Sequence, residues 1–301
     1  MKILITGAHS LLGHSLLAQE TDVELIGCGR GPDAVAGRRY FQLAITDVGQ
    51  VERLLNDLRP DWVINTAAVT DVDRCETDKE GARRVNLDAV SYLADACHQV
   101  DAGLVQLSTD YVFDGASGPY SEADEPHPLS YYGELKLKSE AVVLNSKIKG
   151  LVLRTLCLYG YLPGARLNLV TWPLQVLARR ESLTMINDQW GNPTYVNDLA
   201  QVLLSLCRRN TTGLYHMGGA TYMTKDEVVI EVARFFNLNE KLIGAVSTKI
   251  ARQVAKRPLR SGLRTEALRA VLDSQPLSLT QGLEDMAQDK DFRYDFSHLL
   301  D

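Results

Sequence analysis

The stretch Ile3-Leu4-Ile5-Thr6-Gly7-Ala8-His9-Ser10-Leu11-Leu12-Gly13 decides the fold. Its apolar start is typical of a buried strand, and the glycines frame a turn that opens a helix. Gly7 permits a tight turn, Gly13 lets the helix pack closely on the strand, and free N–H groups at the helix start attract phosphate. The pattern is that of a dinucleotide-binding turn, with Ser10 where a middle glycine is usual; a plain strand-to-helix turn is the alternative. We expect the pyrophosphate to contact Gly7, His9, Ser10, Leu11, Leu12 and Gly13.

Outward from this turn, short apolar runs alternate with segments of helical periodicity, such as 48–58 and 79–100. The alternation predicts an α/β fold with a doubly wound parallel sheet of the Rossmann type. Residues 1–157 are interpreted as a dinucleotide-binding domain and 158–301 as a smaller, partly interleaved C-terminal substrate-binding region. Apolar runs near 183–187 and 213–217 are expected to return to the first sheet as edge strands. The predicted strands of the first half are 3–6, 23–28, 62–66, 104–108 and 151–155.

Composition excludes several classes of partner. The net charge is −6 and the basic residues form no runs, so we expect neither nucleic acid nor a membrane surface as a partner. No apolar stretch approaches the roughly 20 residues that cross a bilayer. The five cysteines form no CxxC, which suits free thiols in a reducing compartment, and we expect a cytoplasmic protein. The histidines show no metal-ligand spacing with cysteines or acids, so no catalytic metal is inferred, and a peripheral divalent ion is left open.

The end of the second predicted strand bears on cofactor choice. Gly27-Cys28-Gly29-Arg30 places a base where an NAD enzyme carries an acid for the ribose 2′-hydroxyl. A guanidinium can bind a 2′-phosphate through two hydrogen bonds, so Arg30 favours NADP(H) over NAD(H), with Arg38 or Arg39 as candidate helpers. A solvated loop arginine is the alternative.

Acid–base chemistry is suggested by Tyr132 and Lys136, four residues apart and hence on one helix face. A nearby ammonium favours the phenolate, so we expect Lys136 to lower the pKa of Tyr132. Hydroxyls and small residues also end two predicted neighbouring strands, where ligands of parallel sheets bind. These further candidates for cofactor or substrate contact are Ala67, Ala68, Asn86, Ser108, Thr109 and Asp110.

At this point the chain resembles a known family, the extended short-chain dehydrogenases, and within it the dTDP-4-dehydrorhamnose reductase group. The match spans nearly the whole chain. The segment from Ser108 to Gly115 is its most specific part, and Tyr132-Gly133 with Lys136 accompanies it. Other matching segments are Ala67-Ala68, Thr70 to Glu76, Arg154-Thr155, Asp188 to Thr194, Asp198 to Ala200, Gly213 to His216 and Arg257-Pro258.

The resemblance implies a function: an NADP(H)-dependent reductase that transfers hydride to the C4 ketone of a sugar nucleotide. It implies that Tyr132 is the general acid, that Lys136 tunes it and holds the nicotinamide ribose, and that Thr109 hydrogen-bonds the carbonyl oxygen. Asn86 would support a proton relay to Lys136. The implied substrate contacts are Asp110, Val69, Thr70, Cys157 and Trp190, although Trp190 also suits packing.

Several positions depart from the family pattern: Ser10, Ala44, Val69 and Cys157, the last replacing a tryptophan of the sugar pocket. They leave dTDP-4-dehydrorhamnose one candidate among related 4-keto sugar nucleotides. Two alternatives remain. One is a sugar-nucleotide epimerase on the same fold, and the other is a non-catalytic NADP-binding regulatory subunit resembling that of methionine adenosyltransferase. A homodimer is kept as a candidate assembly.

Overall fold

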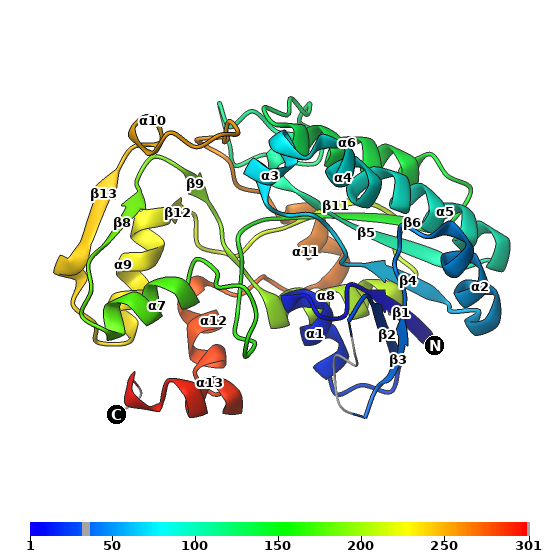
Figure 1. The fold of residues 1–301 in the computed structure, drawn as a ribbon, viewed down its shortest axis with the longest axis horizontal. Helices are drawn as coiled ribbons and strands as arrows, with labels where there is room; N and C mark the ends of the chain where they lie inside the picture. Colours follow the sequence, from blue (N-terminus) through cyan, green and yellow to red (C-terminus); the bar gives the residue numbers. More distant parts are fainter. Residues whose placement is uncertain (32–36, 300–301) are drawn as a thin grey trace.

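A seven-stranded parallel sheet forms the centre of the larger lobe (Figure 1). The computed structural model describes residues 1–31 and 37–299. The sheet order reverses between β1 and β4, which creates the switch point where doubly wound sheets bind ligands. In spatial order the strands are β11 (Gly213–Met217), β6 (Gly150–Thr155), β5 (Gly103–Thr109), β4 (Trp62–Asn65), β1 (Lys2–Thr6), β2 (Glu24–Gly29) and β3 (Arg39–Gln42).

This sheet confirms the predicted fold class. The five strands expected in the first half are β1, β2, β4, β5 and β6, each within two residues of its predicted ends. The sequence interpretation missed β3, whose residues are half-buried or exposed and which, among the described strands, pairs with β2 alone at the sheet edge. An edge strand of this kind lacks the continuous apolar run that marks a strand buried on both faces.

Helices cover both faces of the sheet (Figure 1). One apolar core packs the sheet against α1 (Leu11–Ala18), α8 (Val196–Arg208) and α11 (Glu266–Leu272). The other core packs it against α2 (Val48–Leu58), α5 (Ala89–Val100) and α6 (Tyr131–Leu144). Burial on both faces explains why the central strands are apolar throughout.

Short helices follow the carboxyl ends of β4 and β5. After β4 come α3 (Val72–Thr77), α4 (Lys79–Arg83) and a π-helical turn, η1 (Arg84–Asp88), that runs into α5. After β5 comes η2 (Asp110–Val112), a 3-10 turn. Because these segments begin where the strands end, they border the ligand-binding edge of the sheet.

The smaller lobe combines short strand pairs with helices. The pairs are β7 (Leu158–Tyr159) with β10 (Thr194–Tyr195), β9 (Trp190–Gly191) with β12 (Met223–Thr224), and β8 (Leu183–Ile186) with β13 (Ile243–Val246). The remaining elements are α7 (Thr171–Ala178), α9 (Lys225–Phe235), η3 (Glu240–Leu242), α10 (Thr248–Ala251), α12 (Leu279–Met286), α13 (Lys290–Asp295) and η4 (Ser297–Leu299).

Two segments of the second half were expected to return to the large sheet. Residues 213–217 lie in it as β11, parallel to β6. The expectation is wrong for 183–187, because β8 pairs with β13 in a separate two-stranded sheet. Leu183 and Met185 pack against Leu177 of α7 and Val229 of α9, so burial in the small lobe holds this strand there. Among the described residues, no helix has both the length and the apolarity needed to span a bilayer.

Candidate active site

The phosphate-binding turn is held by close backbone contacts. Gly7 has φ +66°, and a Cβ there would lie 2.8 Å from the Ala67 nitrogen; at Gly13 it would lie 2.4 Å from the Gly7 oxygen. Ser10 caps α1, since its hydroxyl accepts the Gly13 N–H at 2.9 Å and lies 3.0 Å from the Thr66 hydroxyl. The serine in place of glycine therefore stabilises the turn.

Some of the other residues predicted to contact the pyrophosphate lie in the apolar core, and His9 lies at the surface. Leu12 is buried in the core beneath the sheet and Leu11 packs against it, so any contact these two make to a ligand comes from their backbone. His9 lies at the surface beside Gly31, where a Cβ would be 3.2 Å from the imidazole ring, and it packs edge-on against Tyr40. The His9 ring thus borders the end of β2.

Arg30 is exposed directly after β2, and its carbonyl accepts a hydrogen bond from Gln42. The other two arginines considered with it are engaged elsewhere. Arg38 donates to the carbonyls of Leu17 and Gln19 at the end of α1, and the guanidinium of Arg39 lies over the Phe41 ring. Arg30 is therefore the better candidate of the three for a ribose phosphate.

The three expected catalytic residues lie at the junction of β5 and α6. Thr109 ends β5, and Tyr132 and Lys136 lie on the first turns of α6; all three are buried. The Thr109 and Tyr132 side chains interact through a hydrogen bond, which only partly opposes the effect of burial in raising the pKa of the phenol. Gly133 permits this approach of helix to loop, because a Cβ there would lie 2.2 Å from the Tyr111 oxygen.

The pKa of Tyr132 is raised, chiefly by burial and further by the charge of Asp110. The pKa of this phenol is therefore not lowered overall, although the spacing of Tyr132 and Lys136 predicted that it would be, and a contribution of Lys136 itself stays a prediction. Burial lowers the pKa of Lys136 to about 8, opposed by Glu140. A phenol with a raised pKa stays protonated at neutral pH, which suits a proton donor better than a base.

Residues after β4 shape the adjoining wall. The Asn86 side chain accepts the Val69 N–H at 2.8 Å and donates to the Val69 carbonyl at 2.9 Å. Its amide therefore fixes the loop that follows Ala67 and Ala68. Val69 packs in the apolar cluster around Tyr132, whereas Thr70 is exposed. Both bonds that the structure gives the Asn86 side chain go to this loop, so its described role is to position Val69.

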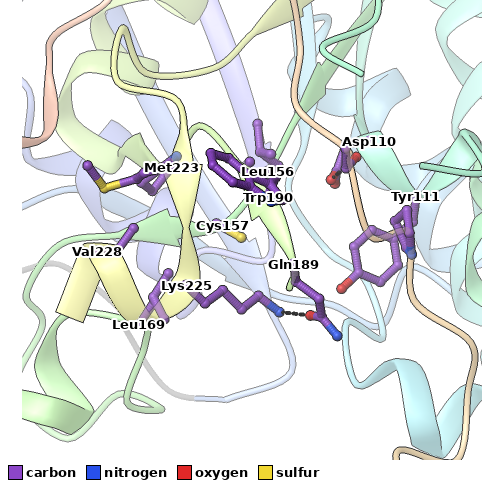
Figure 2. Close-up of a pocket in the computed structure, with 14 residues that line it drawn as sticks. Asp110, Tyr111, Leu156, Cys157, Leu169, Gln189, Trp190, Met223, Lys225 and Val228 are labelled. Carbon is purple, nitrogen blue, oxygen red and sulfur yellow. Dashed lines mark hydrogen bonds between the residues drawn. The ribbon is translucent and has the colours of Figure 1, made fainter. Parts of the chain in front are cut away.

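A pocket opens beside this junction, between η2 and the small lobe (Figure 2). Of the five candidate substrate contacts, Asp110, Cys157 and Trp190 line this pocket, whereas Val69 and Thr70 are not among its lining residues. The Asp110 carboxylate accepts the Ser261 hydroxyl at 2.6 Å and the Thr109 hydroxyl at 3.1 Å. Burial raises the pKa of Asp110 to about 6.

The sequence interpretation missed the polar side chains on the small-lobe wall of this pocket. Lys225, the first residue of α9, donates to the Gln189 side chain at 2.5 Å, and Figure 2 shows this pair across the pocket from Tyr111. Gln189 lies in a segment that carried the family resemblance. Lys225 had no such signal, because only the folded chain brings α9 to the carboxyl end of β5.

A strap from the small lobe crosses to α3, visible in Figure 1 as the orange chain beyond α10. Asp73 accepts the Ala255 N–H at 2.9 Å and pairs with Arg257 at 2.9 Å, and the Arg257 side chain is 8% exposed. These contacts of Asp73 tie the two lobes together beside the pocket, where Pro258 is a lining residue.

Two known proteins are similar in sequence over most of this chain. The dTDP-4-dehydrorhamnose reductase of Aggregatibacter actinomycetemcomitans is 32% identical over 297 residues, covering 95% of this chain and 98% of its own length. Methionine adenosyltransferase 2 subunit beta of Xenopus tropicalis is 36% identical over 245 residues, covering 79% of this chain and 72% of its own length.

The solved structures include a similar fold from the same group. The dTDP-4-dehydrorhamnose reductase of Bacillus anthracis, in complex with NADP, superposes with a TM-score of 0.84 at 29% identity, covering 95% of this chain and 98% of that one. The family model described as the RmlD substrate binding domain matches residues 1–292. With nearly its whole length matched, the chain belongs to the RmlD substrate binding domain family.

Proposed function

We propose that the chain is an NADP(H)-dependent reductase of a 4-keto sugar nucleotide, with dTDP-4-dehydrorhamnose as the first substrate to test. The observation that carries the proposal is the meeting of Thr109, Tyr132 and Lys136 beside a pocket that has polar groups on both walls. A proton donor, a hydroxyl and a buried cation at one edge of the sheet are what reduction of a ketone requires.

The residues at the switch point fit a nicotinamide dinucleotide. A backbone cradle at Gly7 and Gly13 would be filled by any Cβ, and it faces the helix start that attracts phosphate. Arg30 is exposed directly after β2, where a 2′-phosphate would lie. The similar reductase of Bacillus anthracis in complex with NADP supports the same choice. NADPH, when bound, supplies the hydride.

In this proposal the chain's own residues handle the proton. Tyr132 donates its phenolic proton to the oxygen of the reduced ketone, and Thr109 holds that oxygen through its hydroxyl. Lys136 holds the nicotinamide ribose with its buried ammonium, and Asn86 fixes the loop at Val69. Asp110 accepts a hydrogen bond from a sugar hydroxyl once its bond to Ser261 is exchanged.

Each of the two lobes would bind one of the two ligands. Residues 1–157, completed by β11, would bind the dinucleotide, and 158–301 would bind the sugar nucleotide around Trp190 and Lys225. Four of the five cysteines are buried as free thiols, which supports a reducing, cytoplasmic location.

A second function is favoured by one observation, the 36% identity with a methionine adenosyltransferase subunit. In that case the chain would bind NADP(H) and a partner protein without turnover. A regulatory subunit has no need for a buried proton donor, a hydroxyl and a lysine at one point, which is why we prefer the reductase.

The deciding experiment measures NADPH and NADH oxidation by the purified protein with a panel of 4-keto sugar nucleotides. Turnover that is abolished by Tyr132→Phe, with NADPH affinity nearly unchanged, supports the reductase. Unaltered turnover in Tyr132→Phe would refute the role of the tyrosine. NADPH binding with no turnover on any substrate supports the regulatory function.

A further inference from the structure

A buried ion pair lies behind the catalytic residues, between α6 and β6. Glu140 and Arg154 are each 3% exposed at the side chain and share two parallel hydrogen bonds, Nε to Oε1 at 2.8 Å and Nη2 to Oε2 at 2.7 Å. The Ser108 hydroxyl also donates to Glu140, at 2.5 Å. The carboxylate is thus clamped from β5 and from β6.

Stability is a weak reason for such a pair. Two charges lose their hydration when they are buried, and a well-packed apolar pair of similar volume is often at least as stable. Arg154 is further engaged, with its guanidinium 5.0 Å from the Phe113 ring centre and Nη1 3.2 Å from the His216 ring nitrogen. A role other than stability is therefore expected for the fixed Glu140 carboxylate, and it depends on which group lies beside it.

Glu140 lies one helical turn after Lys136, on the same face of α6, and Lys136 is itself 3% exposed. Within the described residues Lys136 has no ion-pair partner inside 4 Å. The Glu140 charge still raises the pKa of Lys136 against the effect of burial. Since its oxygens are bonded to Ser108 and Arg154, Glu140 acts on Lys136 through space.

Other titratable groups around Lys136 are uncharged or directed away. Burial raises the pKa of Tyr132 on α6, of Tyr111 on η2 and of Cys75 on α3, so these stay neutral at pH 7. Burial and Arg154 lower the pKa of His216 on β11 to about 3, so it is neutral too. The charged residues of α4, η1 and α5 are exposed or half-exposed: Lys79, Glu80, Arg83, Arg84, Asp88 and Asp95.

Two buried charged groups remain on the elements packed against α6, Asp110 on η2 and Arg154 on β6. Asp110 is bonded to Ser261 and Thr109, and Arg154 is neutralised by Glu140 itself. Of the groups on the packed elements, Glu140 alone exerts a charge effect on Lys136. Its removal would leave the buried Arg154 of β6 without its partner, which also disfavours a second positive charge nearby.

We propose that Glu140 is a positioning residue of the reaction: clamped by Ser108 and Arg154, it keeps Lys136 charged beside Tyr132 at neutral pH. The inference rests on the proposed function, because it assigns Glu140 to the same site. It goes beyond the expected trio by adding a residue that touches neither substrate nor dinucleotide.

The test compares the wild type with Glu140→Gln, which keeps the shape and removes the charge. Two pH profiles are recorded, kcat/KM for NADPH-dependent turnover and NADPH affinity by fluorescence titration without substrate. In the variant, the loss of activity and of NADPH affinity at high pH should move to lower pH by about one unit or more. Glu140→Asp, which restores the charge, should move both profiles back toward the wild type.

Two further variants separate this role from a structural one. Leu283→Ala weakens the small-lobe core, so it should lower the melting temperature and leave both pH profiles in place. If Glu140→Gln fails to fold, Glu140→Gln combined with Arg154→Met leaves no unpaired buried charge and should show the same shift. Profiles that stay in place in the charge-removing variants overturn the proposal, even if kcat falls. Absence of turnover in the wild type refutes the reductase instead, and the NADPH-affinity profiles still decide the role of Glu140.

Discussion

Replacement of Gly133 by alanine tests whether α6 must lie against the loop after β5. A Cβ at this position would be 2.2 Å from the Tyr111 oxygen, whereas ordinary contact begins at 3.4 Å. The helix and the loop must therefore separate by about 1 Å, at a cost of about 1–3 kcal/mol in stability. Tyr132 adjoins Gly133 on α6, and Thr109 lies just before the loop, so the separation pulls the phenol from the threonine hydroxyl.

A misplacement of about 1 Å at reacting groups lowers the rate on the order of 100-fold. We expect kcat for NADPH-dependent turnover of dTDP-4-dehydrorhamnose to fall by that factor, measured below the variant's melting temperature. Gly49→Ala is the matched control, since a Cβ there makes only ordinary contacts, with the end of the Arg53 side chain at 3.4 Å and with Asp47 Oδ1 at 3.6 Å. That variant should keep its kcat and gain up to about 1 kcal/mol of stability. A folded Gly133→Ala protein with wild-type kcat would refute the reasoning.

Three other predictions follow from single residues. Arg30→Ala should raise the KM for NADPH about 10- to 100-fold and leave the KM for NADH nearly unchanged, because a charge-assisted bond contributes about 1.5–3 kcal/mol; equal effects on both cofactors would contradict the assignment. Arg257→Ala removes the link to Asp73, so steady-state kinetics should show a higher substrate KM at nearly constant kcat, and a fall in kcat alone would argue against a binding role for the strap. The pKa of His216 is about 3 when folded against 6.5 ordinarily, so its contribution to stability is complete above pH 6.5 and declines below it by about 1.4 kcal/mol per pH unit. The free energy of unfolding, measured with urea, should therefore depend less on pH between 6.5 and 5 in His216→Gln than in the wild type. If the two free energies fall in parallel over this pH range, His216 does not make this contribution.

The parts of the fold that the sequence predicted are those where close packing restricts which residue types fit. Strands buried on both faces, such as Leu151 to Thr155, need continuous apolar runs, and the first turn needs glycine at positions 7 and 13 because their neighbours leave no room for a Cβ. The edge strand β3 was not predicted, because Arg39 and Gln42 are exposed and β2 is its one neighbour among the described strands.

The candidate site was predictable only where its residues are close in sequence. Tyr132 and Lys136 share a helix, and Thr109 and Asp110 end one strand, so their proximity follows from local geometry. Lys225 reaches Gln189 only after the small lobe has folded. The direction of the Tyr132 pKa shift was mispredicted for a related reason: helical spacing indicates a nearby lysine, but the burial that raises this pKa is a tertiary property that the spacing does not show.

The completion of the large sheet by β11 has a consequence for how the chain is made. When synthesis has passed Thr155, β6 is an open sheet edge, and the face later covered by α8 exposes Ile3, Ile64 and Leu153. A nascent chain in this state presents both an unpaired edge and an apolar surface, the two features that promote aggregation. Only when Met217 has left the ribosome can both be covered. We expect ribosome-bound chains that end between these points to depend on chaperones, and chains extended beyond β11 to become resistant to proteolysis.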